Sequence, residues 1–153
     1  MLDARTLAAQ LRQPHGEAAL AVGESMNRSN AALNQTAIAL LAVADHEQVL
    51  EIGPGNAAFV PLLLQAQGSR YLGIELSTAM VEAGNQRLAA AGLADRAALR
   101  TGDAHVLPVA DASIDAALAV NTLYFWPDLA PVLTELARVL RRGGRVCLAF
   151  GDA

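Results

Sequence analysis

The sequence predicts an α/β fold in which a mainly parallel sheet of about five strands is doubly wound, with helices on both faces. Short apolar runs alternate with helix-length segments along the 153-residue chain, which is the pattern of strand–helix–strand units. Hydrophobic residues make up 54% of the chain and charged residues only 17%, as expected of a sheet covered on both faces. A glycine-rich turn follows the first apolar run, at the end of a strand, where such sheets bind ligands.

Five apolar runs are the expected strands, and their alternation with helices predicts parallel pairing in the order 3-2-1-4-5. The runs are Val49–Ile52, Tyr71–Ile74, Ala97–Thr101, Ile114–Val120 and Val146–Phe150. Helices are expected at 4–12, in a second stretch broken around Gly23–Asn30, and then at Ala31–Ala44, from Gly55 to about Gln67, at Thr78–Ala91 and at Leu129–Leu140. We expect one domain, 1–153, with a helical N-terminal segment (1–47) and a sheet-containing core (48–153).

Capping and breaking residues set the expected helix ends. Ser29 or Asn30 is the expected cap of the helix Ala31–Ala44, and Ser77 that of the helix Thr78–Ala91. Pro61 must lie in the opening turns of its helix. The expected helix stops are Gly68, Gly92 and the pair Gly143-Gly144.

Composition narrows the classes of partner and the compartment. The net charge of −4 gives no electrostatic case for nucleic acid. The most apolar helix, Ala37–Ala44, is too short to cross a membrane, and the first residues lack the order of a signal peptide. Because Cys147 is the one cysteine, we expect no internal disulfide and a reducing, cytoplasmic compartment.

Four ordered motifs, each next to an expected strand, give the most specific signal. They are Glu51-Ile52-Gly53-Pro54-Gly55-Asn56-Ala57, Gly73-Ile74-Glu75-Leu76-Ser77 followed by Met80, Gly102-Asp103-Ala104 followed by Leu107-Pro108, and Leu140-Arg141-Arg142-Gly143-Gly144. In this order and spacing, the chain closely resembles the class I S-adenosylmethionine-dependent methyltransferases, of the small-molecule, methyltransferase-11-like kind, over residues 26–151. The resemblance implies a Rossmann-like fold that binds S-adenosylmethionine and releases S-adenosylhomocysteine.

The resemblance implies that Glu51 receives the cofactor's ammonium, Glu75 the two ribose hydroxyls and Asp103 the adenine amino group. The cofactor-binding residues it implies are Glu51, Gly53, Pro54, Gly55, Asn56, Glu75, Leu76, Met80, Asp103, Ala104, His105 and Asn121. Leu76 and Val106 are expected to sandwich the adenine ring, with ordinary core packing as the alternative. Other interpretations stay open: Glu51 as a cap of a nearby amide, Glu75 as an acid favoured by a helix N-terminus, and Asp103 as a turn residue.

Two features near the glycine turn complete the comparison with the family. Ala57 stands where the family has a third glycine, and we expect it to be tolerated with a negative φ angle. The pair Met26-Asn27 resembles a lid-like segment that precedes the first strand in related bacterial methyltransferases.

The segment after the fourth expected strand should face the transferable methyl group. Tyr124, Phe125 and Trp126 are expected to line an acceptor pocket, with packing under the following helix as the alternative. The catalytic residue is unknown, and His105 and Tyr124 are the candidate bases. The three histidines show no ligand spacing with cysteine or carboxylates, which predicts that there is no metal site. The basic residues Arg138, Arg141, Arg142 and Arg145 are expected to form a solvated helix end.

The resulting function prediction is methyl transfer to a small-molecule acceptor by in-line displacement. An NAD-dependent oxidoreductase is the less favoured alternative, because Pro54 removes a backbone N–H from the turn and Glu51 would repel a pyrophosphate. A non-catalytic or truncated cofactor-binding domain is the other alternative. The family normally continues with two more strands after the fifth, so we expect either a truncated chain or a homodimer through the exposed fifth-strand edge.

Overall fold

The computed structural model describes residues 4–151 and contains one five-stranded sheet in the order β3-β2-β1-β4-β5, with every pair parallel. The strands are β1 (Gln48–Ile52), β2 (Arg70–Glu75), β3 (Ala97–Thr101), β4 (Ile114–Val120) and β5 (Leu140–Ala149). Both the predicted fold class and the predicted strand order are therefore confirmed.

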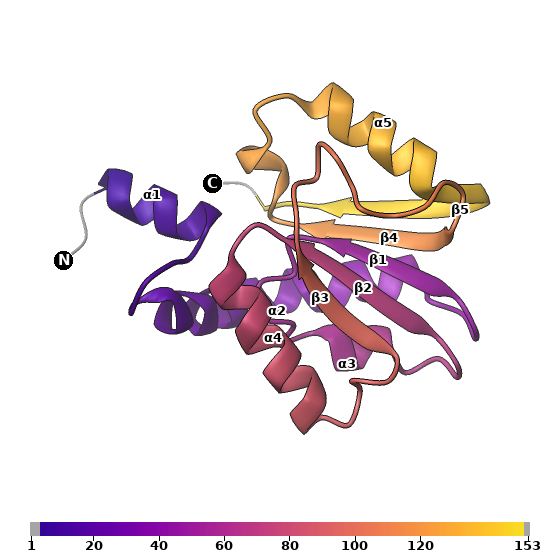
Figure 1. Cartoon of the computed structure of the whole chain (residues 1–153), viewed down its shortest axis with the longest axis horizontal. Coiled ribbons are helices and arrows are strands. Elements are labelled where there is room, and N and C mark those ends of the chain that lie inside the picture. The colour runs from indigo at the N-terminus through magenta and orange to yellow at the C-terminus, as the bar shows by residue number, and fades with distance from the viewer. Residues whose placement is uncertain (1–3, 152–153) are drawn as a thin grey trace.

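Helices cover both faces of the sheet, and each face has its own apolar core (Figure 1). The elements α2 (Ala19–Leu41), α3 (Val60–Leu63) and α4 (Thr78–Ala90) pack on one face, where Leu41, Val60 and Leu88 are buried. On the other face α5 (Leu129–Val139) buries Val132 and Leu136. The remaining helix, α1 (Ala4–Arg12), lies beside the carboxyl ends of the strands (Figure 1).

The register of the central strands gathers the functional loops at one edge. Ile52 of β1 pairs with Ile74 of β2 on one side and with Ala119 of β4 on the other. The loops that follow these strands therefore begin side by side, as the switch point of a doubly wound sheet requires. The short 3₁₀ turn η1 (Leu123–Phe125) follows β4 at this edge.

The predicted break around Gly23–Asn30 is wrong, because α2 runs through it without interruption. Gly23 is buried, and an added Cβ there would lie 3.0 Å from the sulfur of Met80, so this glycine allows α2 to approach α4 closely. Ser29 is not a cap, and its hydroxyl donates to the carbonyl of Ser25 one turn earlier. Asn30 likewise lies within the helix.

Two other helices are shorter than predicted. Only Val60–Leu63 forms α3, although Pro61 does lie in its first turn. The last helix ends at Val139 rather than at the glycine pair, because Leu140 already pairs with Ile114 of β4. Regular pairing resumes between Arg145 and Ala116, so the glycines lie in an irregular part of β5 instead of stopping a helix.

The predicted start of α4 and its glycine stop are confirmed, and the helix ends at Ala90, one residue earlier than expected. The hydroxyl of Ser77 accepts a hydrogen bond from the backbone N–H of Met80 at 3.2 Å, which satisfies one free donor of the first turn. Gly92 follows the helix with a φ of 71°.

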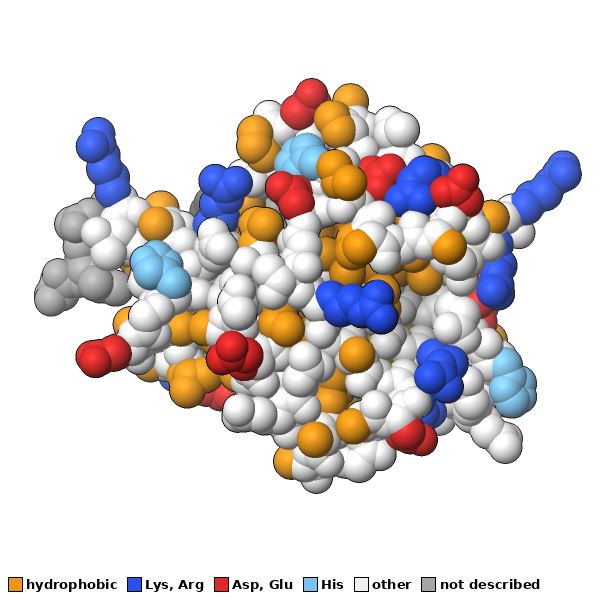
Figure 2. Space-filling view, in the orientation of Figure 1, with side chains coloured by type: hydrophobic (Ala, Val, Ile, Leu, Met, Phe, Trp, Pro, Cys, Tyr) orange, Lys and Arg blue, Asp and Glu red, His pale blue; other side chains and the backbone are white. Residues whose placement is uncertain are grey.

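Basic and acidic side chains of the described residues are interspersed on the face drawn in Figure 2, and neither sign of charge forms a patch of its own there. Within residues 4–151, no helix has both the length and the apolar character needed to cross a membrane.

Candidate cofactor site and adjoining cavity

A cleft runs along the carboxyl edge of the sheet, and we call it the cofactor cleft. Its first half is formed by the glycine turn, Glu51 and Met80, and its second half by Glu75 and the loop after β3. Four residues border both halves, so the two hollows adjoin each other. These shared residues are Arg12, Gly53, Thr122 and Phe125.

The glycine turn has the geometry that its sequence indicates. Gly53 has a φ of 69°, and its N–H donates to the carbonyl of Ile74 at 2.8 Å. An added Cβ at Gly53 would overlap the methyl group of Thr122, so two separate constraints require glycine there. Gly55 has a φ of 59°, but apart from its chain neighbours no atom of the described residues lies within 4 Å of the position of its Cβ. The backbone at Gly55 is therefore open to close approach by a ligand.

Ala57 differs from the sequence expectation, because its φ is 61° and not negative. The left-handed conformation costs an L-residue about 1 kcal/mol. Its N–H closes the turn by donating to the carbonyl of Pro54 at 3.2 Å, and its methyl group is buried in the core. The chain thus keeps the backbone shape of a third glycine with alanine at that position.

Glu51 is a buried acid at the end of β1, with only 5% of its surface exposed. Its Oε2 accepts a hydrogen bond of 2.7 Å from the hydroxyl of Tyr71, so its partner is a phenol rather than a backbone amide. Desolvation raises the pKa of Glu51 to about 7, the bond from Tyr71 opposes this rise, and the nearby charge of Glu75 adds to it. A carboxylate in such a position favours a cationic ligand group.

Glu75 connects the first two loops of the site. One carboxylate oxygen accepts from the N–H of Gly55 and the other from the N–H of Ser77, both at 3.0 Å. Burial raises the pKa of Glu75, and these backbone donors partly offset the rise. The open alternative, an acid at a helix N-terminus, is thus partly realised, because Ser77 is the cap of α4. The side chain of Glu75 also borders the second half of the cleft.

Asp103 forms a compact turn with its neighbour His105. One carboxylate oxygen accepts from the backbone N–H of His105 at 2.9 Å and lies 2.6 Å from its Nδ1. These bonds hold the pKa of Asp103 below its usual value. Both side chains border the cleft, together with Leu76 and Ala104. Val106, the other expected ring contact, is 75% exposed and is not among the residues that line the cleft.

The loop after β3 is held in place by Arg138, which corrects the expectation of a solvated helix end. The guanidinium donates to the carbonyls of Leu107 and Val109 at 3.0 and 2.8 Å, and to the carboxylate of Glu135. Glu135 also accepts from the N–H of Leu107, and Arg138 lowers the pKa of Glu135 to about 2. Arg145 has a comparable role at the end of α2, where it donates to two backbone carbonyls and to Glu47.

The start of the segment after β4 borders the cleft through Asn121 and Thr122. The Oδ1 of Asn121 accepts from the N–H of Gly151 at 3.1 Å, and its Nδ2 donates to the Oδ1 of Asn30 at 2.9 Å. The hydroxyl of Thr122 is buried and has no hydrogen-bond partner among the described residues. Buried hydroxyls nearly always have a partner, and this oxygen lies beneath the surface of the cleft, so a ligand reaches it only after the Thr122 side chain turns.

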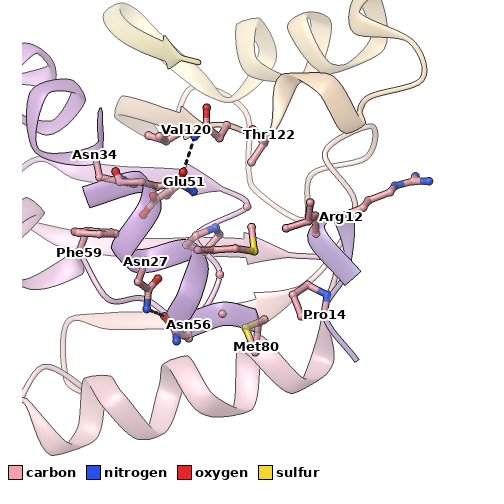
Figure 3. Close-up of a pocket in the computed structure, with 18 of the residues that line it drawn as sticks. Arg12, Pro14, Asn27, Asn34, Glu51, Asn56, Phe59, Met80, Val120 and Thr122 are labelled. Atoms are coloured by element: carbon pink, nitrogen blue, oxygen red, sulfur yellow. Dashed lines mark hydrogen bonds between the residues drawn. The ribbon is translucent and has the colours of Figure 1, made fainter. Parts of the chain in front are cut away.

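The middle of α2 closes the cleft over the glycine turn, which agrees with the lid-like placement expected for Met26 and Asn27. Figure 3 shows Asn27 reaching Asn56, whose Oδ1 accepts from Asn27 Nδ2 at 2.9 Å. Asn56 in turn donates to Glu24 at 3.1 Å. On the opposite side, Arg12 and Pro14 border the same cleft (Figure 3).

A second cavity of about 440 Å³ adjoins the cleft between α1, α2 and η1, and we call it the α1 cavity. Tyr124 and Phe125 line it, and their role as acceptor-site residues stays a prediction. Trp126 does not, because it packs with the core under α5 and borders the cofactor cleft instead. The Tyr124 hydroxyl donates to the carbonyl of Gly151, so it is already engaged in a hydrogen bond.

Sequence reasoning missed several residues of the site. Arg12, Asn30 and Phe59 border the cleft, and Asn30 reaches it from 91 positions before its partner Asn121. No local signal marks such a long-range contact. Within the described part of the chain, no group of three or more His, Cys, Asp or Glu side chains could hold a metal ion.

Comparison with known proteins decides the family. A family model described as a methyltransferase domain matches residues 50–148. The chain belongs to this methyltransferase family. It is 39% identical over 106 residues to 27-O-demethylrifamycin SV methyltransferase from Amycolatopsis mediterranei, and 35% identical over 109 residues to methyltransferase GfsG from Streptomyces halstedii. These matches cover 69% and 71% of this chain but only 38% and 39% of the relatives.

Solved structures of methyltransferases have the same fold. A geranyl diphosphate methyltransferase in complex with S-adenosylmethionine superposes with a TM-score of 0.74 at 23% identity, over 94% of this chain and 58% of that one. The geranyl diphosphate C-methyltransferase from Streptomyces coelicolor A3(2), in complex with S-adenosylhomocysteine, superposes with a TM-score of 0.74 at 22% identity. The match covers 93% of this chain and 54% of that one. This chain therefore spans about two fifths of its first relatives and somewhat more than half of these structures.

Proposed function

We propose that this chain binds S-adenosylmethionine in the cofactor cleft and transfers its methyl group to a small-molecule acceptor. The observation that carries the proposal is the buried Glu51 carboxylate beside the glycine turn, with its pKa near 7. A ligand ammonium would compensate for the burial of this carboxylate. Membership of the methyltransferase family supports the same cofactor.

In this proposal, each residue of the cleft contacts a different part of the cofactor. Glu51 holds the cofactor's ammonium, and the open backbone at Gly55 lets the methionine part lie against the turn. Glu75 has two carboxylate oxygens for the ribose diol, in addition to the backbone bonds it already accepts. Asp103 offers its exposed carboxylate to the adenine amino group. Leu76, Ala104 and Trp126 supply the apolar wall of that half.

The chain's own part in the reaction is positioning and exclusion of water. When bound, S-adenosylmethionine supplies a methyl group that the acceptor's lone pair takes by in-line displacement, and the carbon–sulfur electron pair stays on sulfur. The α2 segment at Met26 and Asn27 covers the glycine turn from solvent. Asp103 lies against Nδ1 of His105, which leaves Nε2 as the nitrogen that can accept a proton, whereas the Tyr124 hydroxyl already donates to a backbone carbonyl.

Calorimetric titration of the chain with S-adenosylmethionine, S-adenosylhomocysteine and NAD in parallel tests the proposal. We expect one site for each sulfur nucleoside and no binding of NAD, because Pro54 lacks a backbone N–H for the pyrophosphate. Binding of NAD alone would instead support the oxidoreductase alternative.

A non-catalytic or truncated cofactor-binding domain is the second candidate function. The observation that favours it is the length of the chain, which covers 38% of its first relative. Cofactor binding without methyl transfer to any tested acceptor, followed by transfer with a longer chain, would identify it.

We further propose that the β5 edge pairs with a second copy of this chain. Among the described residues β5 pairs only with β4, and Val146 of β5 and Phe150, which directly follows the strand, are 43% and 55% exposed. Light scattering at high concentration is expected to give the mass of a dimer. A monomer under the same conditions would rule out this pairing.

The reducing, cytoplasmic location stays a proposal as well. Its basis is the single cysteine, Cys147, which is free in the structure. Cell fractionation tests it, and recovery from an oxidising compartment would contradict it.

A further inference from the structure

The position and lining of the α1 cavity indicate the chemical class of the methyl acceptor. This inference rests on the proposed function. The α1 cavity shares five of its lining residues with the cofactor cleft, so a molecule bound there lies directly beside the cofactor. The shared residues are Leu11, Met26, Asn30, Asn121 and Phe125. Its volume of about 440 Å³ falls within the usual range of about 300–1,000 Å³ for small-molecule sites.

The lining of the α1 cavity is mainly apolar and includes no charged side chain among the described residues. Leu7 and Leu11 of α1 form one wall, one helical turn apart, and Phe125 with Tyr124 forms another. Leu7, Leu11 and Tyr124 are 44%, 37% and 54% exposed, so this wall leaves apolar surface open to solvent. An apolar ligand would cover that surface, whereas a charged ligand would lose its hydration without gaining a partner.

The polar contribution comes from neutral groups, and Asn30 is the one whose orientation can be deduced. Asn121 Oδ1 accepts from a backbone N–H, so its Nδ2 must be the group that faces Asn30. Asn30 therefore presents its Oδ1 to Asn121, and its own Nδ2 is left over. No described residue accepts a hydrogen bond from this Nδ2, which belongs to a side chain that borders both the cleft and the α1 cavity. This Nδ2 is therefore a donor without a described partner at the boundary between the cofactor cleft and the α1 cavity.

The wall formed by α1 is held at a fixed position relative to the cofactor cleft. The segment after α1 is fixed to the β2–α4 turn, because Gln13 Nε2 donates to the carbonyl of Leu76 at 2.9 Å. The Ser77 hydroxyl also donates to the carbonyl of Pro14. The same turn carries Glu75, so the acceptor wall and the proposed ribose contact are parts of one connected structure.

We propose that the α1 cavity binds an uncharged, mainly apolar acceptor and that Asn30 Nδ2 orients an oxygen atom of that acceptor. The site is thus expected to discriminate against acceptors that carry a phosphate, a carboxylate or an ammonium group. Asn30 is a specificity-determining residue for which the sequence pattern indicates only a helix-cap role.

Binding of matched naphthalene probes tests this inference. The chain is titrated with 2-naphthol, 2-naphthoate and naphthylmethylammonium, with and without S-adenosylhomocysteine. We expect 2-naphthol to bind at least tenfold more tightly than either charged probe. Equal or tighter binding of a charged probe would overturn the inference.

Three variants locate the binding. Leu7→Glu places a charge on the cavity wall and is expected to weaken 2-naphthol binding at least tenfold, whereas Leu20→Glu, at a 58% exposed position outside the cavity lining, is expected to leave it unchanged. Asn30→Ala should weaken 2-naphthol by about three- to tenfold but leave naphthalene, which has no oxygen, unaffected. Equal losses for both probes would show that Asn30 only supports the structure and would refute its orienting role.

The titration with S-adenosylhomocysteine separates the two proposals. If S-adenosylhomocysteine binds but 2-naphthol does not, the acceptor inference fails while the proposed function stands. If 2-naphthol binds as expected and S-adenosylhomocysteine does not, the cavity is confirmed and the proposed cofactor is wrong.

Discussion

Replacing Glu51 by glutamine should weaken cofactor binding and stabilise the fold at the same time. The change keeps the shape of the side chain and lets Tyr71 still donate to an oxygen, but it removes the buried negative charge. A hydrogen bond to a charged group contributes about 1.5–3 kcal/mol, so Glu51→Gln is expected to weaken S-adenosylmethionine binding roughly 10- to 150-fold at pH 8. 5′-Methylthioadenosine has no ammonium group, so its binding should not change.

The stability effect follows from the raised pKa of Glu51. Its pKa is about 7 in the folded chain, against 4.5 for a glutamate side chain free in water, so the folded chain binds the extra proton between these values. Stability therefore falls as the pH rises from 4.5 to 7, and the full penalty at pH 8 is about 3 kcal/mol. Glu51→Gln removes this penalty and should raise the Tm by roughly 6–12 °C at pH 8. At pH 5 the penalty is only about 1 kcal/mol, so the gain should be much smaller.

Thermal melts at pH 5 and pH 8, together with calorimetry at pH 8, measure both effects. Glu82→Gln is the matched control, because Glu82 is an exposed acid on α4 and is expected to change neither quantity. A lower Tm for Glu51→Gln at pH 8 would refute the reasoning from buried charge. An unchanged affinity for S-adenosylmethionine would refute the assignment of Glu51 to the ammonium.

The geometry of the site leads to four more predictions. Because Glu51 must be ionised to hold a cation, S-adenosylmethionine affinity should fall about tenfold from pH 8 to pH 6, and calorimetry showing no such fall in the wild-type chain would contradict this. Gly53→Ala should lower the Tm by roughly 5–10 °C, because it combines a positive φ with overlap on Thr122. Gly55→Ala meets only the φ strain and should lower the Tm by about 2–4 °C, so equal losses for the two variants would be evidence against the overlap. Ala57→Gly relieves about 1 kcal/mol of strain but loses a buried methyl group worth about 0.8 kcal/mol, so its Tm should stay within about 3 °C of the wild type, and a larger drop would contradict the strain at Ala57.

The strands could be predicted from the sequence because each is a short apolar run with a clear boundary. The bounds expected for β3 and β4 are those observed, and Ser77 caps α4 as its residue type indicates. The error in α2 has a physical cause, since Gly23 breaks a helix by propensity but here serves close packing against Met80. Tertiary contact outweighed local preference at that position.

Contacts between distant segments were beyond what the sequence could show. The site residues that follow the strands were found because parallel strands bring their ends together. The pairing of Asn30 with Asn121 and the bonds from Arg138 to the loop after β3 depend on how α2 and α5 dock on the sheet. The positive φ of Ala57 is likewise fixed by the path of the turn, because alanine alone predicts a negative angle.

A crystal structure of the chain grown with S-adenosylhomocysteine tests the proposed cofactor site most directly. We expect the ligand in the cofactor cleft, with its amino group within hydrogen-bond distance of Glu51 and its ribose hydroxyls at Glu75. A ligand bound elsewhere, or one whose amino group lies away from Glu51, would contradict the proposed binding mode.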